Sequence, residues 1–251
     1  MCFSLMLSAA CLTTSCGTRN AFVDVGANDG QSLEAVARSR ARPFTSFAAF
    51  ELNPAFAPVL RERLDRLPGG ESNALVQAAA WVREGTIEVD LQLPGQGGRS
   101  ARNLERTQGV VQNMTGSSLI VHGRPLNPGS KCARAAWCAG GHTRTSVRSV
   151  DLAAWLAERF CAADRVFVKI DVEGAEFDLL EHLLAARAGA VAGLLDELAI
   201  EWHAHKFPPL ERPKLKARRT AIASKLKAAG VRFVDWDRLY DKGGWTRRQG
   251  G

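Results

Sequence analysis

A strand, a glycine-rich turn and a helix follow one another near the start of the chain, and this combination constrains the fold more than any other feature. An apolar run ends just before Gly26, Gly26 and Gly30 let the backbone turn tightly, and residues 31–38 have the pattern of a helix. The next apolar run, residues 46–50, ends at Glu51, whose carboxylate can accept both hydroxyls of a ribose. Two such features in consecutive β-α units predict a doubly wound α/β fold with a nucleotide-like cofactor.

Apolar runs alternate with helical patterns along the rest of the chain. Strands are predicted over residues 21–25, 46–51, 74–81, 86–91, 145–150, 165–171, 197–201 and 231–236, and helices over residues 31–38, 55–67, 152–160, 174–186 and 210–229. Asp151 is the expected N-cap of the helix at 152–160. The alternation predicts a mainly parallel sheet with helices on both faces.

The length of 251 residues and the 46% share of hydrophobic residues suit one α/β domain, which we place at residues 20–251. Residues 1–19 are expected to be a leader or the remnant of one, because the stretch is apolar but lacks the basic start of a signal peptide and is too short to span a bilayer. Residues 94–143 are rich in Gly, Pro, Arg, Ser and Asn and predict an irregular insertion that could cover the cofactor mouth.

The formal charge of +7 is concentrated near the C-terminus. Residues 206–248 hold thirteen Lys and Arg against four Asp and Glu. A solvated helix face explains this excess, and contact with an anionic substrate, a membrane surface or nucleic acid is the alternative.

Six cysteines leave the compartment open. Cys132 with Cys138, and Cys11 with Cys16, are close enough in sequence to form disulfides, which would indicate a secretory lumen. Free thiols, as in the cytoplasm, are the alternative. The spacing of Cys132, Cys138 and His142 does not match a zinc site.

Many acidic side chains follow the predicted strands, at the edge where doubly wound folds bind ligands. The residues expected there are Asp24, Gly26 to Gly30, Glu51, residues 78–81, Asp171, Glu173, Glu176, Glu201 and His203. Carboxylates and backbone amides suit a sulfonium cofactor such as S-adenosylmethionine. A dinucleotide would favour a closely spaced Gly-x-Gly, but Asn28 stands at that position.

These residues resemble the FkbM-type methyltransferases over roughly residues 20–205. The resemblance rests on residues 23–30, Glu51, residues 117–119 and 147–152, and above all on residues 169–176, Lys-Ile-Asp-Val-Glu-Gly-Ala-Glu. It implies a seven-stranded class I methyltransferase fold that uses S-adenosylmethionine, usually for O-methylation of sugar or natural-product hydroxyls. Residues 123–141 and the basic C-terminal part depart from the pattern.

The resemblance also implies roles for individual residues. The methionine part of the cofactor would be surrounded by Asp24, Gly26, Ala27, Asn28 and Gly30, with Glu51 on the ribose and Ala79 beside the cofactor. Asp171 and Glu173 would face the transferred methyl group and the acceptor hydroxyl. Asp171 or His203 could take the hydroxyl proton. A divalent metal on these acids would be unusual for this resemblance, and we predict no metal site.

Structural roles are the alternatives for several of these residues. Glu173 and Glu176 could cap the following helix, and His203 could be a strand-end histidine with an ordinary hydrogen bond. Lys169 is expected to pair with Asp171 or Glu201.

Other functions remain open beside methyl transfer to a small molecule or glycan. A nicotinamide-dependent oxidoreductase could use a similar sheet, and a non-catalytic protein on this fold could bind polyanions through its basic C-terminal part. The strand that ends at Asp171 lacks an Asn-Pro-Pro-aromatic tetrapeptide, which argues against amino-methylation of a nucleic-acid base.

Overall fold

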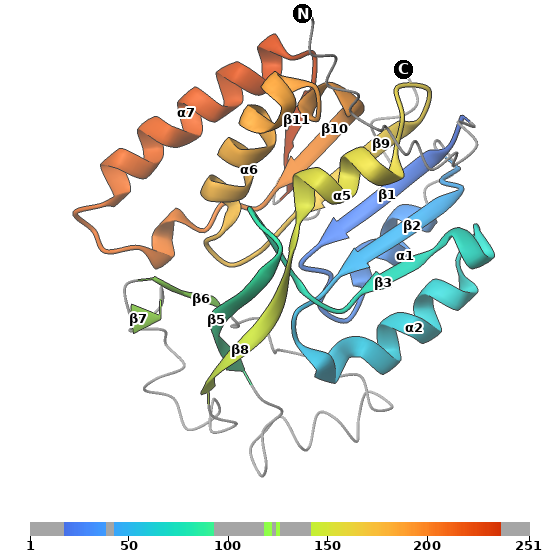
Figure 1. The fold of residues 1–251 in the computed structure, drawn as a ribbon, viewed down its shortest axis with the longest axis horizontal. Coiled ribbons are helices and arrows are strands. Elements are labelled where there is room, and N and C mark those ends of the chain that lie inside the picture. The colour runs from blue at the N-terminus through green and yellow to red at the C-terminus, as the bar shows by residue number, and fades with distance from the viewer. Residues whose placement is uncertain (1–17, 39–42, 93–117, 122–123, 126–141, 237–251) are drawn as a thin grey trace, which may run out of the picture.

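The computed structural model describes residues 18–38, 43–92, 118–121, 124–125 and 142–236, and these form two β-sheets and their covering helices (Figure 1). The larger sheet has six parallel strands in the order β11-β10-β9-β1-β2-β3. Its strands are β1 (Asn20–Val25), β2 (Ser46–Phe50), β3 (Ala74–Val76), β9 (Arg165–Ile170), β10 (Leu195–Ile200) and β11 (Arg232–Asp235). The predicted parallel sheet is confirmed, with six strands rather than seven in the described part of the chain.

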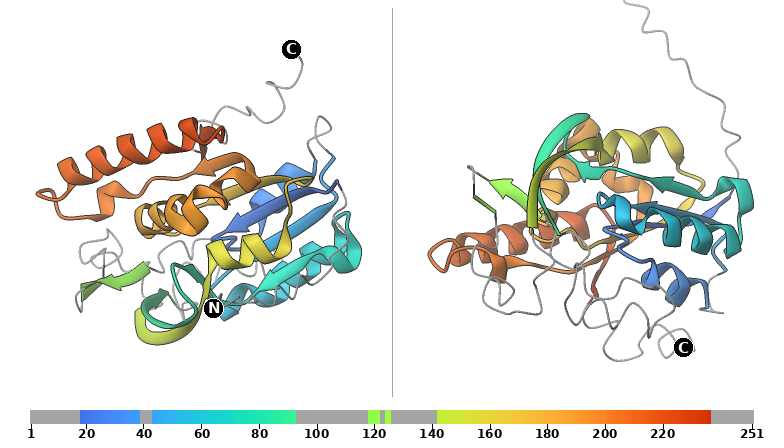
Figure 2. Two further views of the ribbon diagram at one scale, coloured as in Figure 1. Left: turned by 45° about the horizontal axis from the view of Figure 1, so that its top comes forward. Right: turned by 90° about the horizontal axis from the view of Figure 1, so that it is seen from below.

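Helices cover both faces of this sheet, as the sequence predicts (Figures 1 and 2). The α-helices are α1 (Gln31–Ala37), α2 (Ala57–Arg66), α5 (Leu152–Arg159), α6 (Glu176–Ala185) and α7 (Arg212–Ala228). Short 3-10 helices are η1 (Pro54–Phe56), η2 (Gly70–Ser72), η4 (Ala186–Gly189), η5 (Ala192–Leu194) and η6 (Ala204–Lys206). Asp151 caps α5 as predicted, since its carboxylate accepts the Ala154 N–H at 3.0 Å.

The two faces of β1 belong to two hydrophobic clusters because successive side chains of a strand point to opposite faces. Val23 and Val25 pack in the cluster that includes apolar residues of α5, α6 and α7. Phe22 packs in the other cluster, with apolar residues of α1 and α2. All three side chains are fully buried, so β1 lies at the centre of the molecule.

The second sheet has the order β4-β8-β5-β6-β7. Its strands are β4 (Ala79–Trp81), β5 (Gly85–Gln92), β6 (Ser118–Val121), β7 (Arg124–Pro125) and β8 (His142–Asp151). β4 and β8 are parallel, and the remaining pairs are antiparallel. β6, β7 and the start of β8 lie within residues 94–143, for which the sequence predicts an irregular insertion.

The apolar run at residues 74–81 is two strands in two different sheets, so the prediction of a single strand there is wrong. The chain leaves β3 at Gln77, whose side-chain amide donates to the Glu51 carbonyl oxygen at 2.8 Å. The Ala78 N–H then donates to the Val76 carbonyl oxygen at 2.9 Å and closes a tight turn. This turn separates β3, beside β2, from β4, beside β8.

Cys161 is the one cysteine of the described ranges and is disulfide-bonded, which the sequence did not predict. The disulfides expected for Cys132 with Cys138 and for Cys11 with Cys16 lie outside the described residues. Within the described part of the chain, no helix combines the length and the apolar character needed to cross a membrane.

Candidate active site

The register of the parallel sheet brings the carboxyl ends of four strands to one edge. Val25, the last residue of β1, is paired with Phe50 of β2 and with Ile170 of β9. Ile170 is in turn paired with Ile200 of β10. The residues that follow these four strand ends are Gly26, Glu51, Asp171 and Glu201. The predicted grouping of residues from distant parts of the sequence therefore follows from strand pairing.

The loop at residues 26–30 is tied to the end of β2 by backbone hydrogen bonds. The N–H groups of Gly26 and Ala27 both donate to the Phe50 carbonyl oxygen at 3.0 Å. Gly26, Asn28 and Gly30 have φ angles of +82°, +52° and +85°, in the left-handed region that Gly adopts freely and Asn tolerates. The positive φ angles of the loop therefore explain why Gly and Asn occupy these three positions.

Gly26 is also required by a close approach between two strand ends. A Cβ atom at this position would lie 1.8 Å from the Asp171 backbone oxygen. The position that a side chain at Gly26 would take is therefore filled by the residue that follows β9. The absence of a side chain at Gly26 allows the loop at residues 26–30 and Asp171 to pack directly against each other.

Glu51 links the end of β2 to the loop at residues 26–30. One carboxylate oxygen accepts the Asn28 N–H at 2.8 Å and the other accepts the Asn53 N–H at 2.7 Å. Burial raises the pKa of the Glu51 carboxyl to about 7, although the N–H groups of Asn53 and Asn28 act in the opposite direction. Glu51 is thus fixed in place and changes charge near neutral pH.

A buried Lys169 ammonium joins two of the predicted acids. Its Nζ atom lies 3.2 Å from an oxygen of Asp24 and 3.2 Å from an oxygen of Asp171. It also donates to the Gly26 carbonyl oxygen at 3.4 Å. Burial opposes the charge of Lys169, but Asp24 and Asp171 outweigh it and raise the pKa of the lysine. The predicted pairing of Lys169 with Asp171 is confirmed.

Asp24 faces the interior of the protein. Its side chain is fully buried, bonds the Ser32 hydroxyl and pairs with Lys169. Burial raises the pKa of the Asp24 carboxyl, while Lys169 and Ser32 act in the opposite direction. The contacts of Asp24 thus hold Lys169 and the start of α1, behind the loop.

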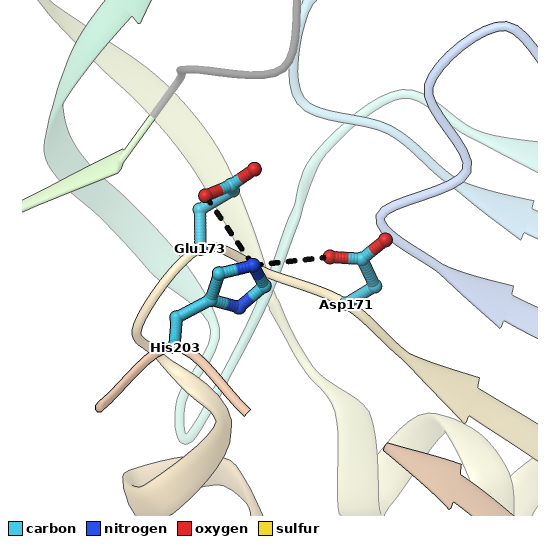
Figure 3. A group of neighbouring side chains, drawn as sticks. All are labelled: Asp171, Glu173 and His203. Atoms are coloured by element: carbon cyan, nitrogen blue, oxygen red, sulfur yellow. Dashed lines mark ion pairs between the residues drawn. The ribbon is translucent and has the colours of Figure 1, made fainter. Parts of the chain in front are cut away.

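His203 follows β10 and lies among carboxylates from the ends of β9 and β10 (Figure 3). Its Nδ1 atom is 2.6 Å from a Glu176 oxygen. Its Nε2 atom is 3.8 Å from Asp171, 3.6 Å from Glu173 and 3.5 Å from Glu201. The structure therefore brings together the three predicted catalytic residues, Asp171, Glu173 and His203.

The carboxylates around His203 change its protonation. Burial lowers the pKa of the imidazole, but Glu176 and Glu201, followed by Asp171, outweigh this and raise it to about 10. The pKa of Asp171 is lowered, since Lys169 and His203 outweigh the effect of burial. Without a ligand, the site at neutral pH contains an imidazolium ion beside an ionised Asp171.

Glu176 has two roles, and only the one at the entry to the following helix was considered from the sequence. The oxygen that meets His203 also accepts the N–H groups of Val172 and Gly174, at 3.3 Å and 3.0 Å, just before α6. Glu176 therefore shapes the entry to the helix and orients His203. Sequence reasoning missed this contact, because the two residues are 27 positions apart and no spacing signal connects them.

Ala79 is buried in β4, which belongs to the second sheet. The turn before it is attached to the site through Gln77 and the Glu51 carbonyl oxygen.

Among the described residues, Asp171, Glu173 and His203 have donor atoms within 4.8 Å of one another, an arrangement that could hold a metal ion.

A comparison with protein families identifies the chain. The model of the methyltransferase FkbM domain matches residues 24–230, which include the loop at 26–30, Glu51 and the cluster around His203. No curated protein and no solved structure matches the chain. The FkbM domain has the class I methyltransferase fold, in agreement with the parallel sheet and its two helical layers. Because the match spans more than half of its length, the chain belongs to the FkbM methyltransferase family.

Proposed function

We propose that this methyltransferase uses S-adenosylmethionine and transfers the methyl group to a hydroxyl oxygen of a small molecule or glycan. The observation that supports this proposal most is the arrangement of the loop at residues 26–30, Glu51 and Asp171 along one edge of the sheet. A backbone loop with left-handed residues is held by Glu51 on one side and packs against Asp171 on the other. Cofactor-binding and acceptor-binding groups would then be neighbours.

The loop and Glu51 would hold the cofactor. Residues 26–30 would surround the methionine part, and the Glu51 carboxylate would accept the ribose hydroxyls. Each Glu51 oxygen accepts one backbone N–H, and a carboxylate oxygen has a second lone pair for a ligand hydroxyl. Asp24 would act from behind the loop through Lys169.

Asp171, Glu173 and His203 would face the acceptor. The hydroxyl oxygen attacks the methyl carbon in line, the carbon–sulfur bond breaks, and its electron pair leaves with sulfur as a neutral thioether. The hydroxyl proton needs a base. Asp171 is ionised and suits this role, whereas the raised pKa of His203 makes the imidazole a hydrogen-bond donor in the ligand-free protein.

Acidic strand ends also distinguish a sulfonium cofactor from a dinucleotide. Asp171, Glu173 and Glu201 meet around one imidazole. A sulfonium cation is attracted by these carboxylates, and a pyrophosphate is repelled. This charge pattern favours S-adenosylmethionine over a nicotinamide dinucleotide.

Transfer of a labelled methyl group tests the proposal. The protein is incubated with methyl-labelled S-adenosylmethionine and fractions of hydroxylated small molecules and glycans, and the labelled product is analysed for a methyl ether. We expect an O-methyl product, with a large loss of transfer in Asp171→Asn and little change in Glu62→Gln, an exposed carboxylate of α2. Label on nitrogen or carbon would contradict O-methylation.

A further inference from the structure

The carboxylates of Asp171 and Glu173 face the same ring nitrogen of His203 at the strand ends (Figure 3). The donor atoms of Asp171, Glu173 and His203 all lie within 4.8 Å of one another. A carboxylate oxygen of Glu201 is 3.5 Å from the same imidazole nitrogen. Two carboxylates and one imidazole, with a third carboxylate beside them, form a nitrogen and oxygen donor set.

The orientation of His203 is set by a contact behind the ring. Glu176 Oε1 accepts two backbone N–H groups, so it is an acceptor toward His203 as well, and Nδ1 carries the hydrogen of that contact. The neutral form of the imidazole consequently presents the Nε2 lone pair to Asp171 and Glu173. A carboxylate behind the ring is the usual arrangement for a histidine that binds a metal.

His203 adds a buried nitrogen donor to the acidic residues. Only 4% of the residue is exposed, and its Nε2 atom lies 3.5 Å from Glu201, 3.6 Å from Glu173 and 3.8 Å from Asp171. An ion with bond lengths of about 2.0–2.2 Å separates neighbouring donor atoms by roughly 3–3.6 Å. The separations of Nε2 from the carboxylates are close to this range, and all three donor atoms lie within 4.8 Å of one another.

The charges around the cluster are unequal. Its carboxylates are those of Asp24, Asp171, Glu173, Glu176 and Glu201. The cations that face them are Lys169 and, when protonated, His203. A sulfonium cofactor would add one positive charge, which still leaves an excess of carboxylates. A divalent cation would offset two of these negative charges.

We propose that Asp171, Glu173 and His203 bind a divalent metal ion, with Glu176 orienting the imidazole. This replaces our expectation from the sequence that the protein has no metal site. The mixed donor set suits first-row ions such as Mn²⁺. The ion would lower the pKa of the bound acceptor hydroxyl. Asp171 would then be a metal ligand, so Glu201 would replace it as the acceptor of the hydroxyl proton. This catalytic role rests on the proposed function, but binding of the ion does not.

Direct binding of Mn²⁺ tests the site without any methyl transfer. The full-length protein is treated with a chelator, dialysed and titrated with Mn²⁺, and free Mn²⁺ is measured by electron paramagnetic resonance. We expect one tightly bound Mn²⁺ per chain, with pulsed spectra that show coupling to an imidazole nitrogen. The coupling should disappear in His203→Gln.

Matched carboxylate variants locate the ion. Asp171→Asn and Glu173→Gln should each weaken Mn²⁺ binding at least tenfold. Glu176→Gln should weaken it about 10- to 100-fold, because outer-shell partners of metal ligands have effects of this size. Glu181→Gln is the control, since it removes an exposed carboxylate from the same helix. Circular dichroism and thermal melting show which variants are folded.

The outcomes separate this proposal from the proposed function. Absence of Mn²⁺ binding to the folded wild type, or equal binding by wild type, Asp171→Asn and His203→Gln, would overturn the metal site. Bound Mn²⁺ without imidazole coupling would also overturn it. Neither result depends on S-adenosylmethionine, so a protein that binds Mn²⁺ but not the cofactor would contradict only the proposed function.

Discussion

His203 Nδ1 lies 2.6 Å from a carboxylate oxygen of Glu176, and this contact fixes which ring nitrogen faces the strand ends. Both residues are almost completely buried, so water cannot easily replace either partner. The contact joins the start of α6 to the end of β10. It makes Glu176 a positioning residue for His203.

Glu176→Gln should lower kcat about tenfold or more while leaving the affinity for S-adenosylmethionine within a few-fold of wild type. The amide keeps the size of the side chain but removes the charge that holds His203. Steady-state kinetics and calorimetry measure the two quantities separately. Glu181→Gln, on the exposed side of the same helix, should leave both unchanged. An equal loss in cofactor affinity would indicate a general structural defect instead.

Glu51→Gln should weaken S-adenosylmethionine binding about 10- to 100-fold, because hydrogen bonds to a charged group contribute roughly 1.5–3 kcal/mol. Glu51→Ala should weaken binding further and lower stability, since the N–H groups of Asn28 and Asn53 lose their acceptor. Calorimetry and urea unfolding measure the two effects. Wild-type affinity in Glu51→Gln would show that the carboxylate does not contact the ribose.

The affinity for S-adenosylmethionine should rise about tenfold between pH 6 and pH 8. The pKa of Glu51 is raised to about 7, so the carboxylate that we propose to bind the ribose is the minor form at pH 6 and the major form at pH 8. Glu51→Gln should lack the pH dependence caused by Glu51. The variant therefore separates the titration of Glu51 from the titration of the ligand. A parallel pH profile in the variant would exclude Glu51 as its source.

The raised pKa of Glu51 also makes stability depend on pH. Stability falls as the pH rises, whereas the affinity for S-adenosylmethionine is expected to increase. The folded protein retains the Glu51 proton up to about pH 7, whereas the unfolded chain releases it near the ordinary pKa of 4.5. The contribution of Glu51 to stability is therefore present below pH 4.5 and is lost as the pH rises through 7. Urea unfolding of wild type and Glu51→Gln across this range measures the contribution.

Gly26→Ala should destabilise the fold by at least about 3 kcal/mol, because the new methyl group meets the Asp171 carbonyl oxygen and the residue has a positive φ. Gly230→Ala is a matched control with φ of +80° and nothing within 4 Å of its Cβ, and should cost only about 1–2 kcal/mol. Urea unfolding compares them. Equal losses would mean that the clash is relieved by movement of the β9 end.

The order of the five described α-helices and of most strands could be predicted because these elements have periodic patterns of their own. The loop at 26–30 and the N-cap at Asp151 depend on local backbone geometry, which the residue types reveal. The break at Gln77 could not be predicted, because the apolar run from Ala74 to Trp81 continues through it. The change of sheet is decided by the partners β2 and β8.

The composition of the site and the pair of Lys169 with Asp171 were predictable, but the other contacts were not. Strand ends predict that Asp171 and His203 share an edge of the sheet. The contact between Glu176 and His203 depends on the packing of α6 against β10, and the reason for Gly26 depends on the distance to another strand. Such tertiary distances have no signature in a single sequence.

Calorimetric titration of the wild-type protein with S-adenosylmethionine and, separately, with a nicotinamide dinucleotide tests the central claim most directly. We predict that one molecule of S-adenosylmethionine binds per chain, that binding weakens in Glu51→Gln, and that the dinucleotide does not bind. Binding of the dinucleotide without any binding of S-adenosylmethionine would contradict the assignment of this strand-end site to methyl transfer.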